Sequence, residues 1–235
     1  MSHSFIQMSD CHIDDVEFCM GVNTHTNLKK IIHKIININT DALLISGDLT
    51  HHGTITAYKT LQKILSPIQT KLLVMSGNHD IQNNLDAVFS NNLFSQFTLG
   101  SWEIISTNSV QKSKTSGFLT QHELTKLDLN LAQSNAKYIL IVLHHPIVPM
   151  RSTWDDSLSL ENPKALFNVL DKYPKIQAIA FGHAHQAAEF SRVGVKIISC
   201  PSTALQFNNE TRIGFNQYTL RTNGQLIIDT QWLLD

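Results

Sequence analysis

The chain has 235 residues, of which 42% are hydrophobic and 16% are charged, and its formal net charge is −1. This length and composition predict a single domain over residues 1–235, and the near-neutral charge argues against a nucleic-acid partner. Residues 1–8 lack the basic and apolar regions of a signal peptide, and no apolar run approaches the length of a membrane span, so we expect a cytoplasmic protein with no membrane partner. The odd number of cysteines, Cys11, Cys19 and Cys200, fits free thiols in a reducing compartment.

Strands and helices are predicted to alternate through the first two thirds of the chain. In chain order we expect a strand at 5–9, a helix at 26–38, a strand at 42–45, a helix at 56–65, strands at 71–75 and 102–106, a helix at 120–132, a strand at 138–143, a helix from 163 to 170 and a strand at 176–181. Thr120 with Glu123, and Asn162 with Pro163, are typical helix starts. From residue 187 to 234 the pattern predicts strands with turns at Val193-Gly194 and Asn223-Gly224. We therefore expect an α/β (α+β) fold, a four-layer αββα sandwich of two mixed β-sheets flanked by helices.

Five short motifs lie where predicted strands end. They are Ser9-Asp10-Cys11-His12, Gly47-Asp48, Gly77-Asn78-His79-Asp80, His144-His145-Pro146 and Gly182-His183-Ala184-His185. Ligands of α/β sheets bind beyond the carboxyl ends of the strands, so loops far apart in sequence can converge there. Each motif alone is more often a turn or a hydrogen-bonded histidine, and the prediction of one site rests on all five in this order.

The side chains of these motifs fit a pair of divalent metal ions. The expected ligands are Asp10, His12, Asp48, Asn78, His144, His183 and His185. Imidazole and carboxylate ligands suit zinc, iron and manganese, and the lack of cysteine ligands argues against a structural zinc site. Two ions about 3.5–4 Å apart need a shared ligand, and Asp48, alone after Gly47, is the expected bridge. Asp10 and His12 are at alternate positions, so in extended backbone they would point the same way and hold one ion.

The order of these motifs resembles that of the calcineurin-like metallophosphoesterase superfamily, and the resemblance runs from Asp10 to about Phe207. Three further stretches are similar to the bacterial 3′,5′-cyclic AMP phosphodiesterase family. They are Gly21 to Thr24, Trp154 to Asn162, and Pro201 to Thr203 with Gln206-Phe207. The resemblance implies an enzyme that hydrolyses 3′,5′-cyclic AMP to AMP through a hydroxide bridging the two ions. Iron and manganese are the favoured ions, with zinc, cobalt or magnesium as alternatives.

The resemblance also implies a role for each residue. Asp10, His12, Asp48 and His185 would bind one ion, and Asp48, Asn78, His144 and His183 would bind the other. His79 would stabilise the phosphate charge or protonate the leaving oxygen, and Asp80 would hydrogen-bond to His79 from behind. The substrate would contact His12, Asn78, His79 and His185.

Several alternatives stay open at this point. The substrate is a cyclic nucleotide or another small diester, such as a 2′,3′-cyclic nucleotide or a glycerophosphodiester. The third hypothesis is a non-enzymatic interaction module on the same fold, and the presence of all expected ligand positions argues against it. The chain is expected to be a monomer or a homodimer.

Other residues near the motifs carry weaker expectations. His145 is expected to support the site rather than bind metal. His51 and His52 are expected on an exposed loop, with a place in the pocket as the alternative. His25 is expected to face solvent, and the segment at Trp154 to cover the pocket mouth or to contact another subunit.

Overall fold

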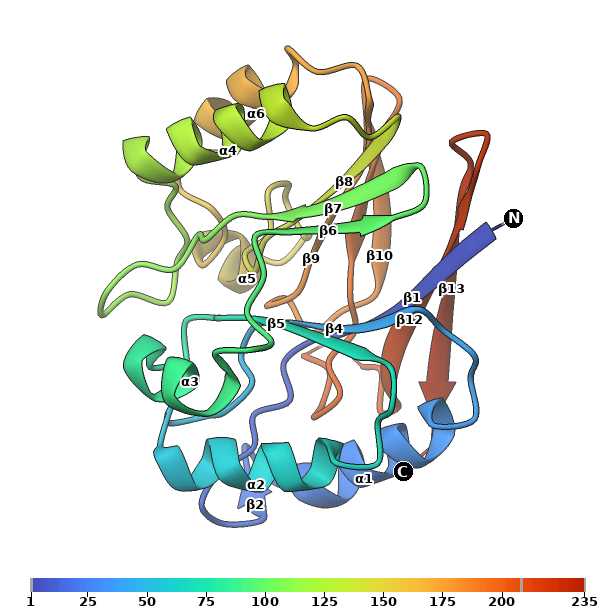
Figure 1. Ribbon diagram of the computed structural model, residues 1–235. Coiled ribbons are helices and arrows are strands. Elements are labelled where there is room, and N and C mark those ends of the chain that lie inside the picture. Colours follow the sequence, from blue (N-terminus) through green and yellow to red (C-terminus); the bar gives the residue numbers. More distant parts are fainter. Residues whose placement is uncertain (1, 208, 235) are drawn as a thin grey trace.

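The computed structural model describes residues 2–207 and 209–234, and it contains two mixed sheets (Figure 1). The five-stranded sheet has the order β13 (Leu226–Leu233), β12 (Ile213–Arg221), β1 (Ser2–Met8), β4 (Ala42–Ser46) and β5 (Lys71–Met75). The six-stranded sheet has the order β10 (Ala188–Arg192), β11 (Val195–Ser199), β9 (Ile176–Phe181), β8 (Tyr138–Val142), β7 (Trp102–Ser106) and β6 (Gln96–Leu99). In the five-stranded sheet β1, β4 and β5 run parallel and β12 and β13 are added by antiparallel pairing on one side. In the six-stranded sheet the four central strands run parallel, and the edge strands β10 and β6 pair antiparallel.

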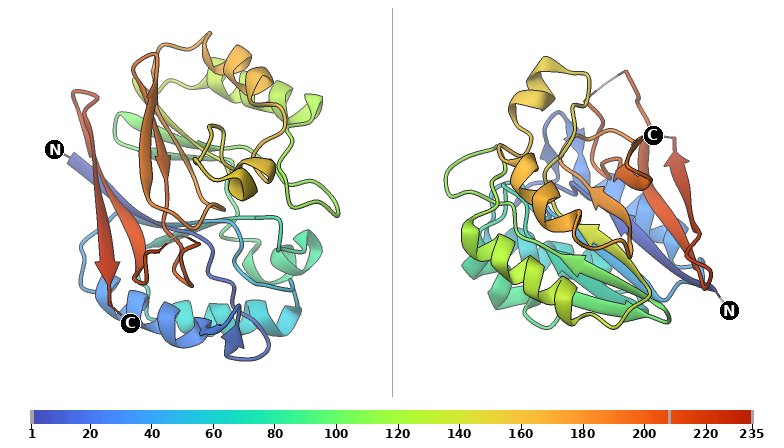
Figure 2. Two further views of the ribbon diagram at one scale, coloured as in Figure 1. Left: turned by 180° about the vertical axis from the view of Figure 1, so that it is seen from behind. Right: turned by 90° about the horizontal axis from the view of Figure 1, so that it is seen from above.

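Helices cover the outer face of each sheet. Helices α1 (Thr24–Ile35), α2 (Ile55–Leu65) and α3 (Gln82–Phe89) lie along one side of the molecule, and α4 (Gln121–Gln133) and α6 (Pro163–Leu170) lie along the other (Figures 1 and 2). The two sheets face each other between these helix layers. The expected αββα sandwich is therefore confirmed.

Three apolar clusters hold the four layers together. Phe5 and Leu44 point into the cluster between the sheets, whereas their neighbours Ile6 and Leu43 point into the cluster beneath α1 and α2. A third cluster, which includes Ile141, lies between the six-stranded sheet and its helices. Successive strand residues point to opposite faces, so a strand buried on both faces reads as a continuous apolar run.

Local sequence explains where most helices begin. Asn23, Thr54 and Thr120 each accept a hydrogen bond from a backbone N–H in the first turn of α1, α2 and α4. The capping pair at α4 is only half formed, because Glu123 accepts from the N–H of Asn108 instead of returning a bond to Thr120. Asn162 precedes α6 as expected, but its side chain bonds to the backbone of Leu119.

Several short elements of the structure were not predicted from the sequence. These are the hairpin of β2 (Phe18–Cys19) and β3 (Val22–Asn23), helix α3, strand β6 and helix α5 (Thr153–Ser157). Two-residue strands and one-turn helices are too short to show a periodic pattern. Helix α3 has no side-chain cap, and only Leu85 and Phe89 are buried in it. Among the described residues, no helix is long and apolar enough to cross a membrane.

Candidate metal centre

Backbone hydrogen bonds join the motif loops. The N–H groups of Asp10 and His12 donate to the carbonyls of Gly47 and Asp48, at 3.1 and 3.0 Å. From the other sheet, the N–H of His183 donates to the Asp10 carboxylate, with 3.0 Å to Oδ2. Loops that follow strands of both sheets therefore meet at one place, as the sequence predicted.

Five of the expected ligands have left-handed backbone. Their φ angles are 55° at Asp10, 45° at His12, 49° at Asp48, 65° at His183 and 45° at His185. The expectation that extended backbone aligns Asp10 with His12 is wrong, because β1 ends at Met8 and both residues lie in the loop that follows it. Such backbone costs about 1–3 kcal/mol per residue and clusters at functional sites.

The first cluster contains Asp10, His12 and His185, all of them buried. The Nε2 atoms of His12 and His185 lie 3.0 Å apart, and Nε2 of His185 lies 3.5 Å from Oδ1 of Asp10. On the far side of its ring, Nδ1 of His185 donates to the carbonyl of Leu205 at 2.8 Å. Nε2 of His185 is thus the nitrogen that faces the other two side chains.

The second cluster forms around His144. Its Nε2 lies 3.1 Å from Oδ1 of Asn78 and 3.4 Å from Oδ1 of Asp48. Its Nδ1 donates to the carbonyl of Ser46 at 2.9 Å. The ring of His183 lies 5.1 Å from that of His144, centroid to centroid. All seven expected ligands therefore belong to these two adjoining clusters.

Asp48 lies between the clusters. Its Oδ2 is 3.7 Å from Nε2 of His12, and its Oδ1 is 3.4 Å from Nε2 of His144. Burial works to raise the pKa of this carboxyl, but the charge of His144 and the hydrogen bond to it outweigh burial and hold the pKa well below its usual range. An ionised carboxylate with one oxygen towards each cluster is suited to act as a ligand shared by two ions.

The histidines differ in how readily they lose a proton. Burial lowers the pKa of His12 well below its usual value and that of His183 to about 4. Burial also works to lower the pKa of His144, but the Asp48 carboxylate outweighs it and raises the pKa to about 9. Neutral imidazoles and ionised carboxylates that converge in this way fit a divalent cation.

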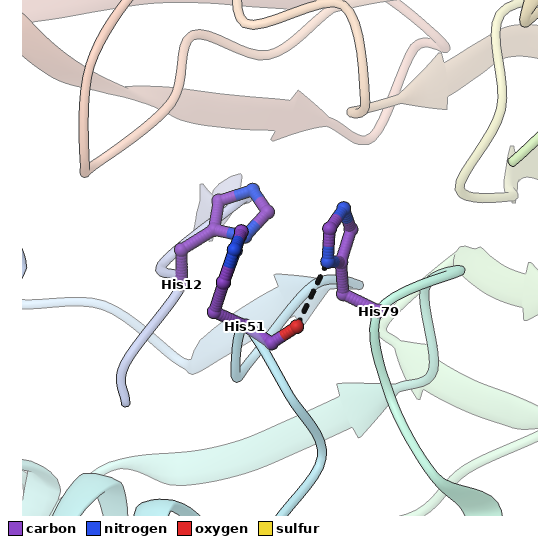
Figure 3. A group of neighbouring side chains, drawn as sticks. All are labelled: His12, His51 and His79. Carbon is purple, nitrogen blue, oxygen red and sulfur yellow. Dashed lines mark hydrogen bonds between the residues drawn. The ribbon is translucent and has the colours of Figure 1, made fainter. Parts of the chain in front are cut away.

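Asp80 does not hold His79 as expected. The Asp80 carboxylate accepts from the N–H groups of Leu49 and Gly77 and from the hydroxyl of Tyr58, at 3.1, 2.9 and 2.8 Å. Nδ1 of His79 instead donates to the carbonyl of His51 at 2.9 Å (Figure 3). The Asp80 carboxylate therefore joins the loop at Leu49 to its own loop at Gly77. Its oxygens already accept from these donors and from Tyr58.

His51 contacts two histidines of the site, although an exposed loop was the first expectation for it. Its ring stacks on that of His79, with 4.8 Å between centroids, and its Nδ1 lies 3.3 Å from Nδ1 of His12 (Figure 3). Its position three residues after Asp48 was the available signal. His52 is exposed and bonds to Asp14, as an exposed loop histidine was expected to be.

Two other histidines are buried. Nδ1 of His145 bonds to the hydroxyl of Ser109 and Nε2 donates to the carbonyl of Thr115, at 2.8 and 3.1 Å, which fits the expected supporting role. The expectation that His25 faces solvent is wrong, because its Nε2 donates to the carbonyl of Asp14 at 2.9 Å and the side chain is buried.

Glycine is required where loops crowd the site. Gly47 has a φ of 105°, and a Cβ there would overlap the ring of His144. A Cβ at Gly182 would overlap the hydroxyl of Ser9. Both positions need a residue without a side chain, so that the loops can approach this closely.

A small pocket of about 80 Å³ opens onto the clusters. Its lining includes His79, His185, Trp154 and Phe207. Phe207 stacks on His185 with 4.0 Å between centroids, and Trp154 meets Phe207 edge to face at 5.0 Å. The expectation that the Trp154 segment lies at the pocket mouth is confirmed.

The fold and site define a metallophosphoesterase. Residues 3–187 match the calcineurin-like phosphoesterase family, so the chain belongs to this family and is a hydrolase. A relative from Ruthia magnifica subsp. Calyptogena magnifica, named "Probable cyclic nucleotide phosphodiesterase", is 84% identical over 99% of this chain and 100% of its own length. The 3′,5′-cyclic adenosine monophosphate phosphodiesterase CpdA of Pseudomonas aeruginosa is 28% identical over 86% of this chain and 76% of its own length. A dimetal phosphatase from Danio rerio has the same fold, with a TM-score of 0.78 over 98% of this chain and 96% of that chain at 13% identity.

Proposed function

We propose that this protein is a binuclear metal-dependent phosphodiesterase that hydrolyses 3′,5′-cyclic AMP to AMP. The observation that carries the proposal is the 84% identity, over nearly the whole chain, to a relative named "Probable cyclic nucleotide phosphodiesterase". The choice of 3′,5′-cyclic AMP is supported by the printed name of the Pseudomonas aeruginosa relative. The two adjoining His/Asp clusters support the metal dependence.

The ligands divide between the two ions. Asp10, His12, Asp48 and His185 would hold one, and Asp48, Asn78, His144 and His183 the other. When bound, two such ions would supply a hydroxide nucleophile at neutral pH, because they would lower the pKa of water to about 7, and they would neutralise the phosphate oxygens.

His79 would act on the leaving oxygen. Its Nδ1–H is donated to the carbonyl of His51, so Nε2 is the nitrogen left for the substrate. In its protonated form this Nε2 donates to the phosphate or to the leaving alkoxide. Proton donation of this kind speeds a reaction by about 10²–10⁴-fold.

Trp154 and Phe207, the aromatic residues at the rim of the pocket, would recognise the base of the nucleotide. Phe207 covers one face of His185, and Trp154 is 56% exposed beside it. An exposed indole offers a flat surface on which a nucleobase can stack. A diester without a base gains nothing from this contact.

The test is a rate comparison on 3′,5′-cyclic AMP, 2′,3′-cyclic AMP, glycerophosphocholine, bis-nitrophenyl phosphate and AMP with added Mn²⁺. We expect 3′,5′-cyclic AMP to react fastest and AMP to release little phosphate. A monoester carries nearly two negative charges, and the described lining of the pocket contains no arginine or lysine to receive the second. Arg192 does not line this pocket, and its guanidinium donates to the carboxylate of Asp171.

Turnover of the artificial diester without turnover of 3′,5′-cyclic AMP would remove the cyclic nucleotide assignment and leave the metal chemistry. Faster turnover of AMP than of any diester would remove the diesterase assignment.

A further inference from the structure

Two buried histidines of the site, His144 and His185, share one arrangement. His144 and His185 turn Nε2 towards the clusters and donate Nδ1–H to the carbonyls of Ser46 and Leu205. A histidine that binds metal through one ring nitrogen usually donates the other N–H to a fixed acceptor, which sets its tautomer and orientation. Nε2 of His12 also faces the first cluster, 3.0 Å from Nε2 of His185.

The acceptor for His12 is a side chain. Nδ1 of His12 lies 3.3 Å from Nδ1 of His51, within hydrogen-bond distance. If Nε2 of His12 binds a cation, its Nδ1 carries the proton, and Nδ1 of His51 must accept it.

The main chain holds His51 in place for this contact. The N–H of His51 donates to the carbonyl of Ile13, the residue after His12, at 3.0 Å. The ring also stacks on His79 at an interplanar angle of 22° (Figure 3). The backbone of His51 is therefore held by Ile13, and its ring packs against His79.

We propose that His51 is a positioning residue for the metal site: its Nδ1 accepts the Nδ1–H of His12 and so keeps Nε2 of His12 aimed at the ion. This inference rests on the proposed metal-dependent function. His51 would accept the Nδ1–H of His12, as the main-chain carbonyls of Ser46 and Leu205 accept those of His144 and His185.

Two substitutions separate the acceptor from the ring. His51→Asn places Oδ1, an acceptor, where Nδ1 stands, whereas His51→Phe keeps a stacking ring without an acceptor. His52→Ala is the matched control, because His52 is the next residue and bonds to Asp14 rather than to His12.

The measurement is Zn²⁺ affinity by competition with a chelator, on variants whose fold is checked by circular dichroism. We expect His51→Phe to weaken one of the two ions by about 10–100-fold, and His51→Asn and His52→Ala to stay near the wild type. In the Zn²⁺-loaded wild type, ¹⁵N NMR should show the proton of His12 on Nδ1 and that of His51 on Nε2.

Wild-type affinity in a folded His51→Phe variant would overturn the positioning role alone. A proton on Nδ1 of His51 would do the same. Wild-type protein that binds neither Zn²⁺ nor Mn²⁺ would overturn this proposal and the proposed function together.

Discussion

Nε2 of His12 and Nε2 of His185 face each other at 3.0 Å in the buried centre of the site. Two neutral imidazole nitrogens at this distance need a shared proton or a cation between their lone pairs. The Asp10 carboxylate, 3.5 Å from His185, adds negative charge at the same place.

Asp48→Ala should remove both ions and abolish activity, because Asp48 has one oxygen towards each cluster. Metal analysis of the purified variant measures the loss. Asp171→Ala, which removes an exposed carboxylate paired with Arg192, is the control and should keep both ions. Two ions per chain in Asp48→Ala would contradict the bridging role.

His79→Ala should keep both ions and the fold but lower kcat by about 10²–10⁴-fold on a poor leaving group. The loss should shrink with nitrophenolate, which leaves without a proton. An equal loss on both kinds of substrate would mean that His79 stabilises phosphate charge instead. Loss of metal would make His79 a ligand.

Metal binding should release a proton from His144. Its pKa in the metal-free fold is raised to about 9, so at about pH 7.5 the ring is protonated and the ion must displace that proton. The same raised pKa stabilises the metal-free fold fully below about pH 6.5, and this contribution is lost as the pH rises through about 9. Calorimetry of Zn²⁺ binding in buffers of different ionisation enthalpy counts the protons, and binding without release would contradict the assignment.

Trp154→Ala should raise KM for 3′,5′-cyclic AMP about 5–160-fold, because base stacking on an aromatic side chain contributes about 1–3 kcal/mol. Its rate on glycerophosphocholine, which has no aromatic ring to stack on the indole, should stay near the wild type. Parallel kinetics on the two substrates test this. An unchanged KM for 3′,5′-cyclic AMP would rule out stacking on Trp154.

All three cysteines should be free and slow to react. Burial raises the pKa of Cys11 to about 12 and that of Cys19 to about 11, so little thiolate forms at neutral pH. Alkylation should be slow in the native protein and complete after unfolding. A native mass lower by two hydrogen atoms would reveal a disulfide and contradict this prediction.

The amino-acid sequence was enough to predict the architecture and the place of the site. The bounds of the strands at 71–75, 102–106 and 176–181 agree with the structure, because continuous apolar runs between turn residues have few other solutions. The motifs mark strand ends, and parallel strands bring their carboxyl ends to one edge. Residue type and order therefore predicted which loops meet.

The directions of the side chains in those loops depend on the assembled fold. Asp10 and His12 are oriented by left-handed backbone, which no periodic pattern predicts. The partners of Asp80 and His51 come from other loops, so they depend on contacts between segments distant in the chain. Periodicity describes regular backbone, whereas a loop takes its conformation from the hydrogen bonds that the whole fold makes available.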